Sequence, residues 1–411
     1  MAKQVRRQRD DARRHAEALA RIHDLARAGQ HAEACDAATA ALGSTRDPSQ
    51  LLDLLDARIT SALALLELAR AETDAQQMIT LALRSRSAAA KARAHCALAA
   101  VQARQERVAA ARRSAAAALR AARHSREPAL VALALLRQAI VESLAGSGKA
   151  EAPADAAARL FEQLGDPALQ SQALRVLCGV RLLQADTPAN RALGARAVAL
   201  ARAAGDKGGE SRALNTLYSS HPDLAERLRG LKQALLLAIE AGDRQQESSA
   251  LHNLCLTYNQ IGLRRHALRL MQRSLELRGA SLAPQAALNP LLIVCTLQAS
   301  VGDRAGFDEA LARLERASAA AELAPGSKLA SWVKHAPARG ERWLDPEAAA
   351  ALWRPLVRGL RDSEWFKPLV LAMTTRAELR AGHAQRAPRW RRGVVRARAV
   401  ATQPRVARLW T

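Results

Sequence analysis

Histidine, cysteine and paired aspartate are the residues of this chain whose chemistry could support catalysis or metal binding. The ten histidines are scattered, and a lone helical histidine such as His252 or His266 is more often a surface or structural residue than a base or ligand. Aspartate pairs such as Asp53 and Asp56 lie beside arginines on predicted solvent-facing helix surfaces. The HExxH, GxSxG and Rossmann glycine patterns are absent. We therefore expect no catalytic, metal or cofactor-binding residues and no enzyme activity.

The cysteines and the one glycine–lysine pair also lack the spacing of a functional motif. No CxxC pair occurs, which excludes a zinc ribbon or disulfide scaffold and suits a reducing cytoplasm. In the segment 146–153, Lys149 is followed by Ala150, and Ser143 stands where a phosphate loop requires its first glycine. We interpret this segment as a flexible insertion between two helices. The five cysteines are Cys35, Cys96, Cys178, Cys255 and Cys295.

The composition of the 411-residue chain favours helices. Hydrophobic residues make up 49%, alanine dominates them, and aromatic residues account for only 3%. Alanine has the highest helix propensity and lets helices pack closely, whereas runs of alternating β-branched residues are absent. The N-terminus lacks the apolar core of a signal peptide, and no apolar stretch approaches 18 residues. We expect an all-α cytoplasmic protein with no membrane segment.

The formal net charge of +23 permits two interpretations. The chain has 62 Lys and Arg residues, of which only eight are Lys, against 39 Asp and Glu. A basic surface could bind nucleic acid or an acidic partner, because arginine pairs bidentately with phosphate and carboxylate. Alternatively, a GC-rich genome encodes abundant Arg and Ala on any tolerant helix surface. We favour the second interpretation because the arginines are spread over the whole chain.

Repeated glycine–aspartate pairs connect the predicted helices. The segments Phe161–Asp166, Ala201–Asp206 and Ala238–Asp243 each end in Gly-Asp, and a new Ala/Leu run follows. Glycine ends a helix in the left-handed conformation, and aspartate caps the next helix. This pattern predicts a stack of helical hairpins.

The clearest repeat covers residues 248–278. Its first helix carries apolar residues on one face, Gly262 makes the turn, and the second helix again has one small and apolar face. The small residue late in the second helix recurs at intervals of 39, 40, 37 and 40 residues, at Ala118, Ala157, Ala197, Ala234 and Ser274. The face residues are Leu251, Leu254, Cys255 and Tyr258, followed by Ala267, Met271, Ser274 and Leu275. Cysteine recurs at one repeat position, which predicts a small buried side chain.

This repeat resembles the tetratricopeptide repeat, in the long variant found in bacterial transcription activators of the maltose-regulon type and in arms fused to nucleotide cyclases. The resemblance implies a right-handed α-solenoid with a period of about 37–40 residues. It also implies non-enzymatic binding, by a protein–protein interaction scaffold or a sensory arm of a bacterial signalling protein. We expect helical repeats over residues 1–320, irregular Trp-containing repeats over 321–387 and a basic tail over 388–411.

In such stacks the first helices line a concave groove that holds a protein or peptide. By register, this groove would present polar side chains whose amides can bind a peptide backbone. The alternative is that these side chains are merely solvated. The predicted groove residues are Asn215, Thr216, His252, Asn253, Leu256, Asn259 and Gln260. A rival hypothesis from another class is a basic nucleic-acid-binding α-solenoid.

All six tryptophans and an unusual terminal segment lie in the last eighty residues. A repeat hairpin begins near Gly382, but Pro388 falls where its second helix should start, and no acidic residue follows Glu378. The tail could be a nucleic-acid-binding arm, a disordered solubilising tail or an out-of-frame translation. We favour the last interpretation, under which an output domain is missing from this chain.

Overall fold

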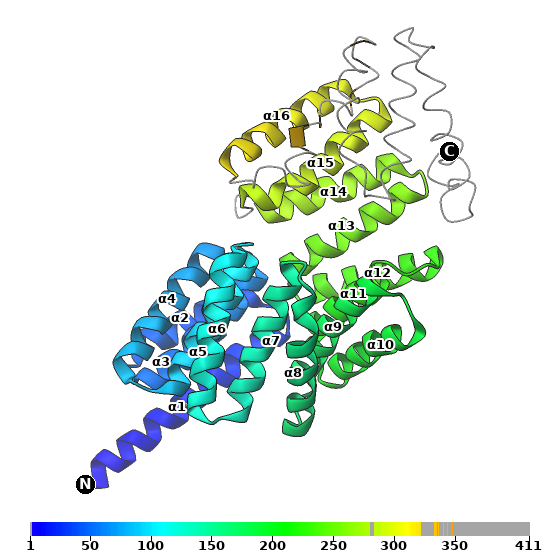
Figure 1. Cartoon of the computed structure of the whole chain (residues 1–411). Coiled ribbons are helices and arrows are strands. Elements are labelled where there is room, and N and C mark those ends of the chain that lie inside the picture. The colour runs from blue at the N-terminus through cyan, green and yellow to red at the C-terminus, as the bar shows by residue number, and fades with distance from the viewer. Residues whose placement is uncertain are drawn as a thin grey trace. The chain divides into compact units, whose positions relative to one another are not determined.

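The computed structural model describes residues 2–279 and 283–321, with isolated residues between 333 and 347. Over these residues the chain forms sixteen α-helices and one short 3₁₀ helix, with no strand. The predicted all-α class is therefore confirmed (Figure 1). The chain divides into two compact units, which comprise Met1–Asn253 with Leu277–Ser281 (unit 1) and Leu254–Glu276 with Leu282–Thr411 (unit 2). The division falls inside the segment 1–320 that the sequence suggested as one domain.

Unit 1 is a stack of antiparallel helical hairpins. Its helices are α1 (Ala2–Arg27), α2 (His31–Ser44), α3 (Pro48–Ala64), α4 (Leu68–Ser85), α5 (Ala88–Arg104), α6 (Val108–Ser125), α7 (Pro128–Leu144), α8 (Glu151–Leu164), α9 (Pro167–Gln184), α10 (Pro188–Ala203), α11 (Lys207–Tyr218), α12 (Leu224–Glu240) and the first part of α13 (Arg244–Gln260). The 3₁₀ helix η1 (Gly148–Ala150) leads directly into α8. The segment 146–153 is thus helical from Gly148 onward, which corrects the expectation of a flexible insertion.

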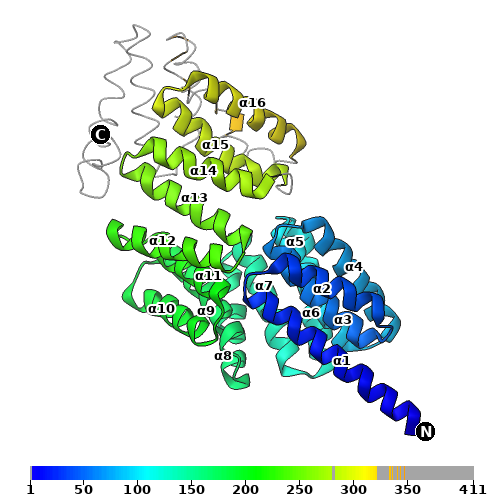
Figure 2. The ribbon, with the colours of Figure 1, turned by 180° about the vertical axis from the view of Figure 1, so that it is seen from behind.

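The helices of unit 1 form an inner and an outer layer. From α1 to α12 each helix packs against the next, and each odd-numbered helix from α1 to α9 also packs against the following odd-numbered helix. No comparable packing joins the even-numbered helices of the described residues. Helices on the inside of a curved stack approach one another more closely than those outside. The odd-numbered helices therefore form the concave layer, and Figure 2 shows α1 to α3 at the start of the stack.

The glycine–aspartate connectors work as the sequence predicted. Each glycine ends its helix in the left-handed region, with φ between +60° and +84°, and each aspartate side chain accepts a hydrogen bond from a backbone N–H in the first turn of the next helix. The capping bonds are 2.7–3.0 Å long. The pairs are Gly165–Asp166, Gly205–Asp206, Gly242–Asp243 and Gly302–Asp303.

Four turns in the N-terminal half adopt the same backbone conformation without glycine. Their left-handed residues are Leu66, Arg86, Glu106 and Arg126, with φ between +55° and +65°. A side chain in this region is strained by about 1 kcal/mol or more. Because these residues are not glycine, the sequence pattern gave no sign of these turns.

The core of both units consists mainly of alanine with interspersed leucine. The recurring small positions Ala118, Ala157, Ala197 and Ala234 are fully buried, and Ser274 is 3% exposed. All five cysteines are buried as free thiols. These positions confirm the periodic small residue that was inferred from the sequence.

Unit 2 continues the same hairpin pattern. Its described helices are the second part of α13, most of α14 (Arg264–Arg278), α15 (Pro284–Val301) and α16 (Arg304–Ala320). The buried face of α14 consists of Ala267, Met271, Ser274 and Leu275, as predicted. Trp343 packs against Phe307 with ring centroids 5.3 Å apart.

The first and last turns of unit 1 meet. Gly29 lies in the α1–α2 turn and Gly242 in the α12–α13 turn, 213 positions later. A Cβ atom added at Gly242 would lie 2.2 Å from the Gly29 carbonyl oxygen, and one at Gly29 would lie 2.5 Å from the Glu240 carbonyl oxygen. Only glycine permits this backbone contact. The stack of unit 1 therefore curves until its first hairpin touches its last turn.

The segments 322–332 and 348–411 lie outside the described residues. The expectations for residues 321–387 and for the tail 388–411 therefore stay predictions, apart from the isolated residues named above. Within the described part of the chain, no helix combines the length and apolarity that crossing a bilayer would require.

Candidate functional site

The inner helices of unit 1 carry a group of four arginines whose charges interact. Arg104 lies at the end of α5, Arg137 is on α7, Arg175 is on α9 and Arg212 is on α11. The charge of Arg104 interacts with those of Arg137, Arg212 and Asp243. Since α5 and α11 are not neighbours in the stack, this interaction crosses the inside of the curved layer. We call Arg104, Arg137, Arg175 and Arg212 the inner arginine cluster.

One member of the inner arginine cluster has a carboxylate partner. Arg212 Nη1 donates a hydrogen bond of 2.8 Å to Oδ2 of Asp243, which is 5% exposed. Asp206 lies farther away, with an N–O distance of 3.9 Å. Asp243 also caps α13 through the backbone N–H of Gln246. The Arg212–Asp243 pair thereby fixes the end of α12 and the start of α13 against α11.

Arg137 and Arg175 have no such partner. The Nε atom of each is shielded from solvent and has no hydrogen-bond partner among the described residues. Burial, together with the positive charges of Arg212 and Arg104, lowers the pKa of Arg175 to about 10. Neighbouring like charges and desolvation therefore both oppose the charged form of Arg175.

Acidic groups occupy the adjoining part of the inner layer. Arg93 pairs with Asp53 at 2.8 Å and with Asp56 at 3.9 Å. Asp56 is partly buried on α3, and solvent reaches 49% of its side chain. Burial there raises its pKa, while the charges of Arg93 and Arg137 oppose the increase. The inner layer thus contains both arginines and carboxylates.

The structure brings some of the predicted groove residues together. Asn253 Nδ2 on α13 donates a hydrogen bond of 3.0 Å to Asn215 Oδ1 on α11. Thr216 uses its hydroxyl to donate to the Arg212 backbone carbonyl at 3.0 Å. Burial lowers the pKa of His252 to about 4, and the charge of Arg278 contributes. His252 is therefore neutral at pH 7.

The remaining predicted groove residues lie on α13 in unit 2. Leu256 is 38% exposed, and Asn259 and Gln260 are partly exposed near the end of the helix. Nothing in the described contacts assigns these three residues to a binding surface, so their role stays a prediction.

The inner arginine cluster was not predicted from the sequence. Arg137 is the only basic residue of α7, and neither Arg137 nor Arg175 has an acidic residue three or four positions away. The sequence signal for these positions is an arginine in an apolar helix with no acidic residue three or four positions away. It was hidden among the many arginines of the chain.

Burial makes three of the cysteines unsuited to nucleophilic chemistry. Burial raises the pKa of Cys96 and of Cys255 to about 12 and that of Cys178 to about 11, so these thiols are protonated at neutral pH. No cluster of three or more His, Cys, Asp or Glu side chains with metal-binding geometry occurs in the described part.

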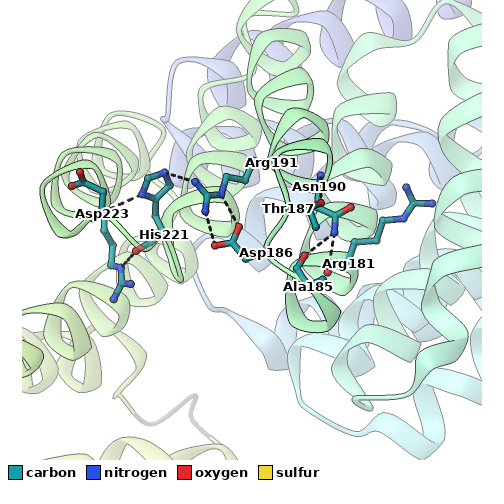
Figure 3. A network of polar contacts seen from close by, with 9 residues as sticks. Arg181, Ala185, Asp186, Thr187, Asn190, Arg191, His221 and Asp223 are labelled. Carbon is teal, nitrogen blue, oxygen red and sulfur yellow. Dashed lines mark hydrogen bonds and ion pairs between the residues drawn. The ribbon is translucent and has the colours of Figure 1, made fainter. Parts of the chain in front are cut away.

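A polar network replaces the glycine–aspartate caps at two connectors (Figure 3). Arg191 donates to both oxygens of Asp186 at 2.6 and 2.7 Å and to His221 Nε2 at 3.4 Å. Since arginine only donates, His221 Nε2 accepts and its Nδ1–H donates to the Asp223 carbonyl at 3.3 Å. Asn190 donates to two carbonyl oxygens at the end of α9. Every group shown has a structural role, so this network is a connector rather than a binding site.

Comparison with known proteins supports the fold assignment. No protein-family model matches the chain, and no curated protein matches it. The apo form of the quorum sensor NprR from B. thuringiensis aligns with a TM-score of 0.53 and 11% identity over 85% of this chain and 99% of that chain. A Rap protein complexed with competence and sporulation factor aligns with a TM-score of 0.45 and 13% identity over 94% and 98% of the two chains.

The similarity to NprR shows a shared fold alone. Together with the repeat positions and the hairpin stack, it identifies the chain as a helical repeat protein of the tetratricopeptide-like kind.

Proposed function

We propose that unit 1 binds a peptide or an extended protein segment along its inner layer and acts as a non-catalytic sensory or regulatory module in bacterial signalling. The observation that carries this proposal is the Asn215–Asn253 pair, which aligns two side-chain amides on adjacent inner helices. A side-chain amide both donates and accepts hydrogen bonds and therefore suits a peptide backbone. Thr216 and His252 belong to the same proposed surface.

NprR is a quorum sensor, which is consistent with this proposal. Because the similarity is one of fold, the sensory role of this chain is part of the proposal. A direct association with a nucleotide cyclase or a transcriptional output domain belongs to the same proposal and rests on the repeat resemblance.

A selection from random peptides tests the proposed function. The immobilised full-length chain is presented with a phage library of peptides about ten residues long, which reach about 33 Å when extended. We expect the wild-type protein to enrich defined sequences and the variant Asn215→Ala/Asn253→Ala to lose them. The matched control is Gln76→Ala/Gln77→Ala, which removes two exposed amides from α4. Failure to enrich any sequence, or equal enrichment by the Asn variant, would contradict the proposal.

Nucleic-acid binding is the weaker alternative because many surface arginines are already paired with acids. Arg112 pairs with Glu142 at 2.8 Å, and Arg202 pairs with Glu210 at 2.6 Å. A labelled DNA duplex added at low and high salt provides the test. Steeply salt-dependent binding, with an affinity that falls by roughly one log unit per phosphate contact for each tenfold increase in salt, would favour this alternative.

A further inference from the structure

We propose that the peptide recognised by unit 1 is acidic and that Arg137 and Arg175 of the inner arginine cluster receive its carboxylates. This inference rests on the proposed function and specifies the chemistry of the partner. It concerns side chains that were not among the predicted groove residues.

Arg137 and Arg175 differ from two paired arginines of the inner layer, Arg58 and Arg212. On the inner helix α3, Arg58 forms a two-point contact with Asp74, with bonds of 2.8 and 2.6 Å. On α11, Arg212 binds Asp243. For Arg137 and Arg175, no hydrogen bond or ion pair is formed among the described residues, although their Nε atoms are shielded from water. A shielded Nε–H without a partner is costly, so an external acceptor would stabilise these two arginines.

The charged groups around Arg175 are positive. The titratable groups that act on it are Arg212, Arg104 and the thiol of Cys178, which is protonated at neutral pH. Arg104 in turn interacts with Arg137. The charges of the inner arginine cluster therefore repel one another across the concave layer. A carboxylate placed between these arginines would relieve the repulsion and satisfy the planar guanidinium in a bidentate manner.

The carboxylates of the inner layer indicate which class of partner can bind there. The same layer contains the carboxylates of Asp53, Asp56 and Asp243 near the arginines. A nucleic acid carries a continuous line of phosphates, which these carboxylates would repel. A peptide with separate Asp or Glu side chains can place its carboxylates at the arginines and neutral groups at the acids. The mixture of arginines and carboxylates therefore favours an acidic peptide over a nucleic acid.

The peptide selection described above also tests this inference. We expect the sequences enriched by the wild-type protein to be rich in Asp and Glu, and the variant Arg137→Gln/Arg175→Gln to lose this preference. The control is Arg84→Gln/Arg113→Gln, which removes the same charge from exposed positions on the outer helices α4 and α6. The control variant should retain the preference for acidic peptides.

Affinity measurements on one synthetic peptide sharpen the test. The most enriched peptide is compared with its counterpart in which every Glu and Asp is replaced by Gln or Asn. We expect the acidic form to bind at least about tenfold more tightly to the wild-type protein, as charge-assisted hydrogen bonds imply. That advantage should disappear in Arg137→Gln/Arg175→Gln. Inorganic phosphate is added as a competitor, and displacement of the peptide at millimolar phosphate supports an anion site at the arginines.

The results of these experiments distinguish the preference for an acidic peptide from peptide binding itself. Enrichment of neutral peptides that still depend on Asn215 and Asn253 would overturn the acidic partner and leave peptide binding in place. An equal loss of acidic preference in Arg84→Gln/Arg113→Gln would show that net charge, rather than the inner arginine cluster, attracts the peptide. A thermal unfolding midpoint for Arg137→Gln/Arg175→Gln that is no lower than that of the wild-type protein confirms that the variant is folded.

Discussion

The titration of His252 makes the stability of unit 1 depend on pH. Burial and the charge of Arg278 lower its pKa to about 4 in the folded protein, below the ordinary value of 6.5. The unfolded chain therefore takes up a proton first as the pH falls from 6.5 toward 4, and this uptake favours unfolding. We expect the free energy of unfolding to decrease by about 2 kcal/mol between pH 7 and pH 5 from this residue.

Urea unfolding of the wild-type protein and of His252→Gln at both pH values measures this contribution. The variant should lose about 2 kcal/mol less stability on acidification than the wild-type protein. His124→Gln, at an exposed position on α6, is the matched control and should behave like the wild-type protein. Identical pH dependence in His252→Gln and the wild-type protein would show that His252 is not buried in a neutral form.

Arg126 has a backbone conformation that is unfavourable for an arginine. It ends α6 with φ of +61°, a region that suits glycine, and its side chain is exposed. We expect Arg126→Gly to raise the free energy of unfolding by about 1 kcal/mol, because glycine removes the left-handed strain. The control Arg123→Gly, inside the last turns of α6, should instead lower it by about 1 kcal/mol. Thermal unfolding of the three proteins distinguishes these effects, and a destabilised Arg126→Gly would refute the strain argument.

At the scale of helices and turns, the residue types at helix ends and the spacing of apolar residues predicted much of the fold. Glycine–aspartate connectors specify a left-handed residue and a capping side chain within two positions, and the structure shows both. The buried face of α14 followed from its spacing alone. The turns at Leu66 and Glu106 were not recognisable, because packing of the flanking helices imposes a conformation that these residues do not favour.

Leu254 tests whether neighbouring hairpins depend on one another for burial. It lies on α13, in the part that belongs to unit 2, and is 2% exposed. In a stack of repeats each hairpin buries its apolar face mainly against the neighbouring hairpins. We expect Leu254→Asp to cost more than about 4 kcal/mol and to increase hydrogen exchange in α14 and α15 together. The control Leu263→Asp, at a position that is 52% exposed, should change little. Faster exchange confined to α13 would contradict this interdependence.

At the scale of the whole molecule, the features that define the candidate site depend on contacts distant in sequence. Arg104 and Arg212 belong to hairpins that are more than a hundred residues apart, and only the curvature of unit 1 brings their charges together. The sequence gives the type and spacing of the repeats but not the small rotation between them that sets the curvature. The predicted Asn215–Asn253 neighbourhood was recoverable because it follows from register between adjacent repeats.

The contact between Gly29 and Gly242 tests whether this curvature is closed in solution. Alanine at Gly242 would place its Cβ 2.2 Å from the Gly29 carbonyl oxygen and force the two turns apart. Gly165→Ala is the matched control, because Gly165 has φ of +69° but no atom within 4 Å of the added Cβ. Both variants pay about 1 kcal/mol or more for the left-handed alanine, so any further effect belongs to the contact. We expect only Gly242→Ala to increase hydrogen exchange in the α1–α2 turn around Gly29 and His31. Equal exchange in this turn in both variants would show that the first and last turns of unit 1 are not in contact in solution.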